Sequence, residues 1–579
     1  MKRLCLLILV TALLAPIPSA LTQTPAKPEL LLLNAHIITM NPQNPSAEAV
    51  AVKDGRIAWV GSTAEAKTLF GNAVETLDLG GATVLPGIID AHAHLMSLGE
   101  SFLKLDLKGA ATPEEVARRV REKAATVRSG EWILGWGWDE GKWAGSYPTH
   151  ELLTEAAPTN PVFLTGLHSF AAWANRRALL VAGINKDTRD PENGKIIRDE
   201  KTGEPSGMLI NRAQDLVASH VPPLDLDSVK IALELAAREC LRNGLTSVHE
   251  ARVTPIMLRA FREMIKKGRL PLRVYAMLDG ANSALIDEWL NRGPEIDPQH
   301  RLTIRSVKVF ADGALGSRGA ALFEPYADAP NTKGSITTSE ADIYELTRRC
   351  LGRGFQVVTH AIGDAANHQV LDAYERALKQ APGATPGTSA SDARVGGNDA
   401  RLRIEHAQVL AAADIPRFAE LGVIASMQPT HCTSDMAWAE KRIGPARIKG
   451  AYAWRSVLKT GAHVPISSDF PGETLNPFYG IYAAVTRQDP QGKPEGGWYP
   501  DQRMTMEEAL RGYTIEAAYA EFEEKQKGSI EKGKLADLIV ISKDPTTVAP
   551  RELLRTVVLK TFIEGRVVHS VGAANPGDR

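Results

Sequence analysis

Apolar runs that alternate with helical stretches occupy the middle of this 579-residue chain and constrain its fold most. Strand–helix alternation favours parallel βαβ units, and eight such strands predict an α/β fold with a TIM-like (β/α)8 barrel. The alternative is an open doubly wound sheet, but no glycine-rich phosphate-binding motif follows the first run. The eight runs are residues 81–94, 245–251, 272–278, 303–312, 355–363, 401–408, 422–429 and 462–470.

Both ends of the chain consist of short alternating strands instead. The pairs Asp54-Gly55 and Glu564-Gly565 lie between apolar runs, which is typical of hairpin turns. Isolated two-stranded hairpins are only marginally stable in water, so one small β-sandwich domain built from both ends is the economical interpretation. This composite β domain is predicted to comprise residues 28–82 and 526–572, and the barrel residues 83–525.

The gap between the first two predicted strands is far longer than a normal βα interval. It predicts an insertion at about residues 100–225, which contains Trp132, Trp136, Trp138 and Trp143. The first three share strand parity, which would place them on one face of a strand. A second, shorter insertion at residues 381–399 is rich in Gly, Ser and Ala and is typical of a surface loop. The longer insertion leaves the barrel at its active-site rim, so we expect a lid.

The first 20 residues have the layout of a secretory signal peptide, with a basic start, a short apolar run and small residues before the expected cleavage after Ala20. The run is short for a membrane span, so we expect an exported protein, periplasmic or secreted, without a stable span. The net charge is −1, which gives no support for nucleic-acid binding. A small-molecule substrate is the expected partner; a homodimer is compatible with these features.

Several predicted strands end in residues that bind metals. Active sites of (β/α)8 barrels lie where the strands end, so these residues would meet at one rim. Each residue alone is a weak signal, since a strand-end histidine or a buried lysine is more often structural. The ordered set is what points to a metal centre. It consists of His92 and His94 on strand one, Lys308 on strand four, His360 on strand five, His406 on strand six and Asp469 on strand eight.

These residues resemble the amidohydrolase superfamily in order and in strand number. Longer stretches narrow the resemblance to the amidohydrolase-3 branch, which includes N-substituted formamide deformylases. The stretches are "LPGIIDAHAHL", "GWGWDE", "KVFADGALGSR", "THAIGDAAN", "RIEHAQ", "SSDFP" and "GSIEKGKLADLIV". The chain departs from the branch at His168-Ser169-Phe170, where many members carry Asp-Gly-His. That difference puts a substrate role of the usual histidine in doubt, although His168 lies close by.

The resemblance implies one or two divalent metal ions, for which imidazole and carboxylate ligands favour Zn²⁺. His92, His94 and Asp469 would bind the first ion, and His360 and His406 the second. Lys308 would bridge the two ions as a carbamate formed from CO2. Burial between valines favours the neutral amine that such a reaction needs. The alternative is an unmodified Lys308 beside a single ion.

The predicted function is hydrolysis of a C–N bond in an amide, formamide or cyclic amide. A metal-activated hydroxide would attack the carbonyl, with Asp469 as general base and then general acid. Two alternatives remain at this point. One is an exported non-catalytic metal-binding or regulatory protein on the same fold, and the other is a Schiff-base enzyme that uses Lys308. The candidate substrate contacts are Trp138, His168, Arg318, Asp364 and His431.

Overall fold

The computed structural model describes residues 27–71, 75–138, 143, 147–166, 171–192, 194–380 and 399–572. The predicted signal peptide, His168 and nearly all of the predicted loop at 381–399 lie outside these residues. Among the described residues, no helix combines the length and the apolar character that a membrane crossing needs.

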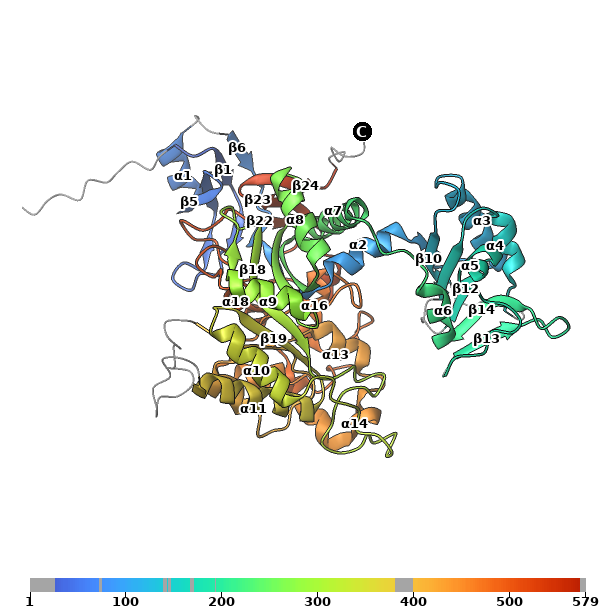
Figure 1. Cartoon of the computed structure of the whole chain (residues 1–579). Helices are drawn as coiled ribbons and strands as arrows, with labels where there is room; N and C mark the ends of the chain where they lie inside the picture. The colour runs from blue at the N-terminus through green and yellow to red at the C-terminus, as the bar shows by residue number, and fades with distance from the viewer. Residues whose placement is uncertain are drawn as a thin grey trace, which may run out of the picture.

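The centre of the molecule is the predicted parallel barrel (Figure 1). Seven parallel strands follow each other around it, and the short antiparallel β17 (Glu295–Ile296) pairs with one of them. The barrel strands are β8 (Ile88–Ala93), β15 (Leu245–Val253), β16 (Arg273–Asp279), β18 (Leu302–Phe310), β19 (Gln356–Ala361), β20 (Arg403–His406) and β21 (Ile424–Ser426).

The eighth predicted run closes the barrel as an extended segment between β21 and β8. The Ser467 amide donates to the Met427 carbonyl on one side, and the Asp469 amide donates to the His92 carbonyl on the other, at 3.1 and 3.0 Å. The (β/α)8 fold predicted from the sequence is therefore confirmed.

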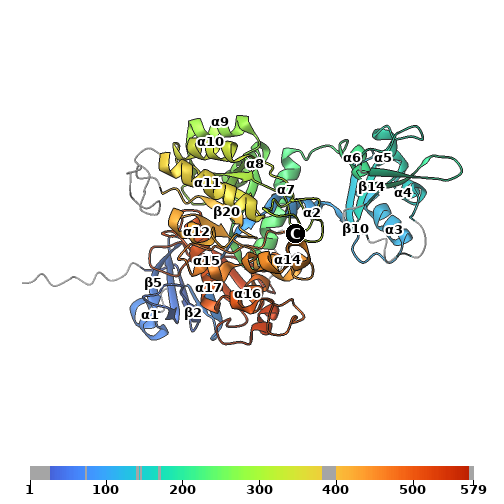
Figure 2. The same ribbon diagram turned by 90° about the horizontal axis from the view of Figure 1, so that it is seen from below.

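Helices cover the outside of the barrel in Figures 1 and 2. The sequence of α7 (Leu226–Arg242) shows why they form: the Asp225 side chain accepts a hydrogen bond from the Ser228 amide, and Val229, Leu233 and Ala236 are buried at helical spacing. The other long covering helices are α8 (Pro255–Lys266), α9 (Ser283–Arg292), α10 (Glu340–Leu351) and α11 (Asp364–Gln380).

Strands from both ends of the chain combine beside the barrel. In one sheet, β22 (Leu538–Ile541) pairs with both β23 (Val558–Ile563) and β7 (Thr83–Pro86), so the C-terminal strands continue directly into the N-terminal ones. Apolar side chains of this sheet share a core with β1 (Leu30–Leu33) and β4 (Ala49–Lys53) of the second sheet. A buried ion pair between Arg273 and Asp537 ties this region to the barrel.

The insertion after the first barrel strand forms a separate lobe with its own six-stranded sheet. Figures 1 and 2 both show it beside the barrel, at the far end of α2 (Leu95–Leu103), instead of over the barrel mouth. Helix α2 packs against α7, and a Cβ on Gly99 would meet the Ala232 carbonyl oxygen at 2.2 Å. The strands of the lobe are β9 (Leu105–Asp106), β10 (Ile133–Trp138), β11 (Val162–Gly166), β12 (Ala171–Ala174), β13 (Gly194–Arg198) and β14 (Pro205–Asn211).

The tryptophans of the lobe do not line one face, contrary to the expectation from strand parity. The pairing of β10 with β11 shifts register between Trp136 and Trp138, and Gly137 between them has φ +98°. This irregularity turns Trp138 into a core that also contains Ile133, whereas Trp132 packs on the opposite face with Leu134. A parity argument fails wherever a strand bulges.

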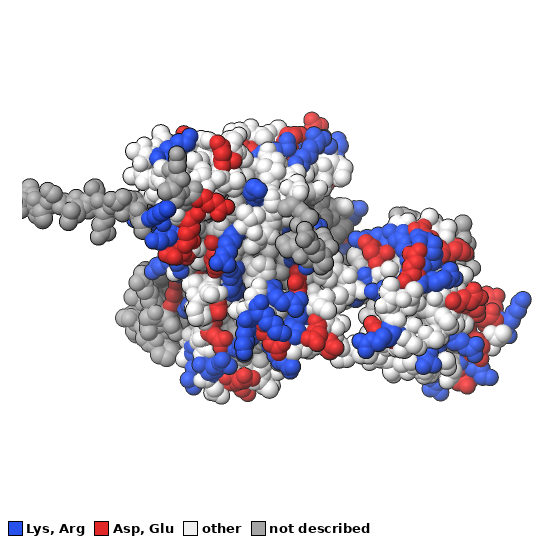
Figure 3. Space-filling model, turned by 90° about the horizontal axis from the view of Figure 1, so that it is seen from above, with Lys and Arg blue, Asp and Glu red and all other residues white. Residues whose placement is uncertain are grey.

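The surface carries both signs of charge in close mixture. On the face in Figure 3, basic and acidic side chains alternate over the barrel and the lobe.

Candidate metal centre

All six predicted metal-ligand residues lie at the mouth of the barrel, where its strands end. His92 is within β8 and is buried, whereas His94 follows that strand and stands at the N-terminus of α2 with about a third of its side chain exposed. The His92 and His94 ring centroids are 5.4 Å apart. The period-2 spacing seen in the sequence therefore brings both rings to one place.

Unusual backbone conformations aim two of these side chains into the mouth. His406 and Asp469 have φ values of 71° and 62°, in the left-handed region that side-chain-bearing residues rarely adopt. Ala407 follows at 41°. Such strain persists only where the surroundings enforce it, and it gathers at functional sites.

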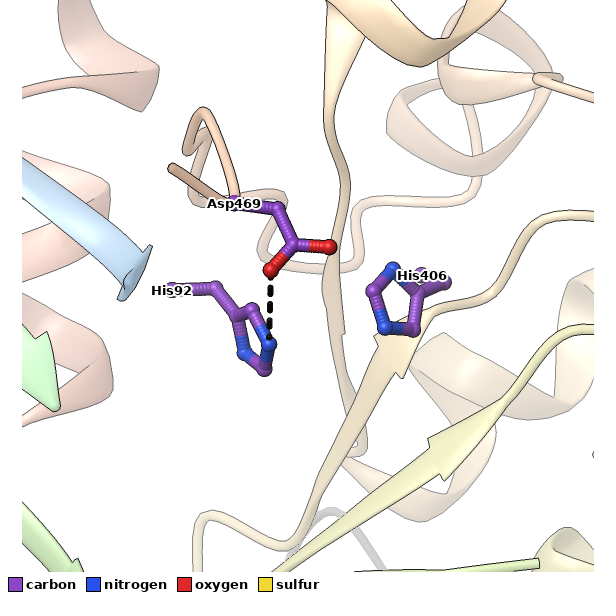
Figure 4. A group of neighbouring side chains, drawn as sticks. All are labelled: His92, His406 and Asp469. Carbon is purple, nitrogen blue, oxygen red and sulfur yellow. Dashed lines mark ion pairs between the residues drawn. The ribbon is translucent and has the colours of Figure 1, made fainter. Parts of the chain in front are cut away.

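Asp469 is the centre of the cluster. Its Oδ1 lies 3.5 Å from His92 Nε2 and 3.2 Å from His94 Nε2, and its Oδ2 lies 3.6 Å from His431 Nε2. One potential ligand atom each from His92, His406 and Asp469 lie within 4.8 Å of one another (Figure 4). The His360 and His406 ring centroids are 4.5 Å apart, which brings the fourth histidine to the same cluster.

Neighbouring side chains leave the inward nitrogens of two histidines free to bind a metal. His406 Nδ1 is 2.8 Å from Gln428 Oε1, and the Gln428 amide donates to Ser467 Oγ at 2.9 Å. Because the Gln428 oxygen can only accept, His406 Nδ1 carries the proton and Nε2 keeps its lone pair. The buried carboxylate of Glu405 faces His92 Nδ1 in the same manner, at 2.7 Å. This is the usual support of a metal-binding histidine.

Burial keeps two of the predicted histidine ligands neutral. It lowers the pKa of His92 to about 4 and that of His360 to about 3, with Lys308 adding repulsion in both cases. Burial also lowers the pKa of Lys308 to about 8. The Lys308 Nζ is enclosed and has no hydrogen-bond partner among the described residues. A buried amine without an acceptor beside four imidazoles and a carboxylate fits a metal centre that includes a modified lysine.

Three buried carboxylates that were not predicted as ligands hold the surrounding backbone. Asp90 accepts from the Ser468 amide, from the Ser468 hydroxyl at 2.6 Å and from the His92 amide, and so joins the first strand to the closing segment. Glu250 accepts from the first amides of α2. Asp312 accepts from three backbone amides of neighbouring loops. The position of Asp90 two residues before His92 was a usable signal, whereas Asp312 was marked only by its place in the stretch "KVFADGALGSR".

The predicted substrate contacts divide into two groups. His431 belongs to the mouth, since it faces Asp469 and its ring stacks on His406. Arg318 instead pairs with Asp328 at 2.9 Å, and Asp364 accepts from the Phe323 amide at 3.0 Å, so both hold loops.

Trp138 is fully buried in the lobe, where it stacks on Trp143 and donates to the Leu164 carbonyl. We therefore correct the interpretation of Trp138: the structure makes it a core residue of the lobe.

A cavity of about 270 Å³ lies between α13 and α16, and none of the predicted metal ligands is among its lining residues. Helix α13 (Pro429–Asp435), which carries His431, forms one wall, and α16 (Pro477–Thr486) forms another. A hydrogen bond of 2.6 Å from the Ser434 hydroxyl to Glu473 spans it. The lining side chains include Thr430, Thr433, Ser434, Glu473, Tyr479 and Tyr482.

A (β/α)8 barrel with histidines and an aspartate gathered at its mouth defines the class of metal-dependent barrel hydrolases. The chain belongs to the amidohydrolase family, whose model matches residues 75–569. The resemblance carried by the sequence motifs is thus confirmed, and as a member of this family the chain is a hydrolase.

Individual relatives agree with this assignment. Protein LONG AFTER FAR-RED 3 of Arabidopsis thaliana is 33% identical, over 93% of this chain and 91% of its own length. The N-substituted formamide deformylase of Arthrobacter pascens is 30% identical, over 93% of this chain and 97% of its own length. The crystal structure of an uncharacterized metal-dependent hydrolase from Pyrococcus furiosus superimposes with a TM-score of 0.74 at 30% identity, and the match covers 90% of this chain and all of the other.

Proposed function

We propose that this chain hydrolyses a C–N bond in a small amide, formamide or cyclic amide. The observation that carries the proposal is the convergence of His92, His406 and Asp469 within 4.8 Å at the barrel mouth, beside the buried amine of Lys308. The name of the Arthrobacter relative supports an amide-like substrate.

The metal would be held by His92, His94, His360, His406 and Asp469, with Lys308 between two ions. Imidazole nitrogens together with a carboxylate suit Zn²⁺. When bound, such an ion polarises a carbonyl and lowers the pKa of water to about 7.

Asp469 would hold and move the proton. Burial alone would raise its pKa, but the hydrogen bond from His94 lowers it, and the pKa lies well below its usual range, so the side chain is an ionised acceptor at neutral pH. Its Oδ atoms face the histidine rings at the centre of the mouth. Asp469 accepts the proton as the nucleophile forms and then returns it to the leaving amine. His431, 3.6 Å from Oδ2, is placed to orient the carboxylate or to donate to the developing oxyanion.

Lys308, converted to a carbamate, would be the ligand shared by the two metal ions. Its neutral amine would attack CO2 through the nitrogen lone pair, so that a C–N bond forms while one C=O π bond opens to give the carboxylate charge, and the nitrogen loses one proton to water. The product would be a carbamate, whose two oxygens could serve as metal ligands and which would remove an uncompensated amine from the core.

The cavity beside α13 would take the nitrogen substituent. At about 270 Å³ it suits a small aromatic or aliphatic group, and Tyr479 and Tyr482 offer aromatic surface. This assignment replaces the expected contact with Trp138.

Metal analysis combined with a hydrolysis screen tests the proposal. We expect one or two divalent ions per chain, hydrolysis of at least one class among formamides, simple amides, N-acyl amino acids and cyclic imides, and loss of activity with chelator that returns with Zn²⁺. His92→Ala and His406→Ala should lose metal and activity together, whereas His463→Ala, whose ring pairs with Glu516, should lose neither. Full activity in metal-free protein would overturn the proposal, and metal binding without hydrolysis would favour the non-catalytic alternative.

A further inference from the structure

The interior of the barrel beneath His92 is filled with charged side chains, where a TIM-type barrel ordinarily holds branched apolar residues. Arg403, Glu405 and His249 have no exposed surface, and Glu521 is 1% exposed. Burying charges is costly unless they are paired, and a buried pair is seldom more stable than apolar side chains of the same volume. The arrangement therefore calls for a role other than stability.

The upper part of this polar interior contacts a predicted metal ligand. Strand β20 alternates, so Arg403 and Glu405 both point into the barrel. Glu405 lies with Oε2 2.7 Å from His92 Nδ1, and its other oxygen pairs with the Arg403 guanidinium. Arg403 also donates to Ser426 Oγ at 3.0 Å. A carboxylate paired with arginine only accepts, so His92 Nδ1 must carry a proton and Nε2 must hold the lone pair.

The lower part fixes the arginine. Arg403 donates to His249 Nδ1 at 2.8 Å, so the His249 proton lies on Nε2, which faces Glu521 Oε1 at 3.4 Å. Lys527 pairs with that same Glu521 oxygen at 3.0 Å and donates to Ser247 Oγ. The chain of contacts thus runs from Lys527 through Glu521, His249, Arg403 and Glu405 to His92, and each side chain in it has a defined role as donor or acceptor.

We propose that the Arg403–Glu405 pair, anchored from below by His249 and Glu521, is a positioning device that holds His92 in its Nδ1-protonated form with Nε2 turned toward the metal. This inference rests on the proposed function, since it gives the pair a role in building the metal centre. The pair itself touches neither substrate nor metal, so its effect on turnover is indirect.

Removing the whole pair gives the sharpest test, because no unpaired charge stays buried. The variant is Arg403→Met with Glu405→Leu, and the matched control is Arg273→Met with Asp537→Leu, another buried pair at the other end of the barrel. The Zn²⁺ dissociation constant is measured against a competing chelator. We expect about 10- to 100-fold weaker binding in the first variant, the usual effect of losing a partner of a metal-binding histidine, and an unchanged constant in the control. Folding is checked by circular dichroism.

A second readout follows the proton on His92 in metal-free protein. With ¹⁵N-labelled histidine rings, assigned through His92→Gln, the wild type should show only the Nδ1-protonated form, and the double variant a mixture of both forms. Glu405→Gln keeps the shape and an acceptor oxygen, so it should give a smaller shift and serves if the double variant fails to fold. Unchanged affinity and an unchanged ring form in a folded variant would overturn the inference. A wild type that binds Zn²⁺ but hydrolyses no amide would instead overturn the proposed function alone.

Discussion

Lys308 offers the most quantitative prediction of this structure, because only its neutral amine can react with CO2. Burial lowers its pKa to about 8, from an ordinary value of 10.5. At pH 7 the neutral fraction is then about 9%, compared with about 0.03% for an exposed lysine, a gain of roughly 300-fold. Modification of Lys308 should therefore depend on pH in the physiological range.

The assay starts from metal-free protein at a fixed concentration of dissolved ¹³CO2, to which Zn²⁺ is added between pH 6 and pH 9. The initial rate of carbamate formation, followed by ¹³C NMR, should rise about tenfold per pH unit below pH 8 and level off above it. Lys308→Ala should give no signal and lose binuclear loading, and short carboxylic acids should partly restore the loading. Lys230→Ala serves as the control, since Lys230 is paired with Asp227 and Glu263.

Two results would refute this reasoning. Full binuclear loading in CO2-free buffer would show that the bridge is not a carbamate. A crystal structure with both metals beside a bare Lys308 ammonium would lead to the same conclusion.

Three further outcomes are expected. Asp469→Asn should lower turnover by about 10² to 10⁴-fold, because an amide cannot accept the proton, and equal turnover at equal metal content would exclude the role. Trp138→Ala should destabilise the lobe by about 3–5 kcal/mol in denaturant unfolding while metal content is kept, and a loss of metal instead would contradict the core assignment. Asp537→Asn should cost about 1.5–3 kcal/mol, because Arg273 loses its bidentate carboxylate partner and keeps only the contact with Glu564. Arg273 holds the pKa of Asp537 below 3.8 despite burial, so this stability is present above about pH 4 and is lost in wild type, but not in the variant, as pH falls further.

The barrel and its mouth were predictable from the sequence because they depend on local patterns. Apolar runs with helical stretches between them define βα units, and the chemistry of a barrel lies where its strands end. His92 and His406 could therefore be singled out without any contact information. The closing segment shows the limit of the pattern: it carries Asp469 and closes the barrel, yet it pairs only through scattered backbone hydrogen bonds.

Contacts between segments that are far apart in the chain could not be predicted from the sequence. The link from His92 to Glu405 and Arg403 joins residues more than 300 positions apart, and in sequence both charges resemble ordinary strand residues. The same holds for Glu521, which enters the barrel from the C-terminal region. The prediction for Trp138 was wrong for a local reason. The irregularity at Gly137 turns this side chain to the face opposite the one that strand parity assigns.

The attachment of the lobe has a consequence for the metal centre. Helix α2 carries the lobe, and its N-cap residue is His94, so a movement of the lobe would act on a predicted ligand if nothing else held the base of the helix. The His94 side chain makes no capping hydrogen bond to the helix. Glu250 on β15 takes that role by accepting from the Leu95 and Met96 amides, and Gly99 lets α2 lie directly against the backbone of α7. The base of α2 is therefore held to the barrel independently of the lobe, so that His94 can keep its place whatever position the lobe takes.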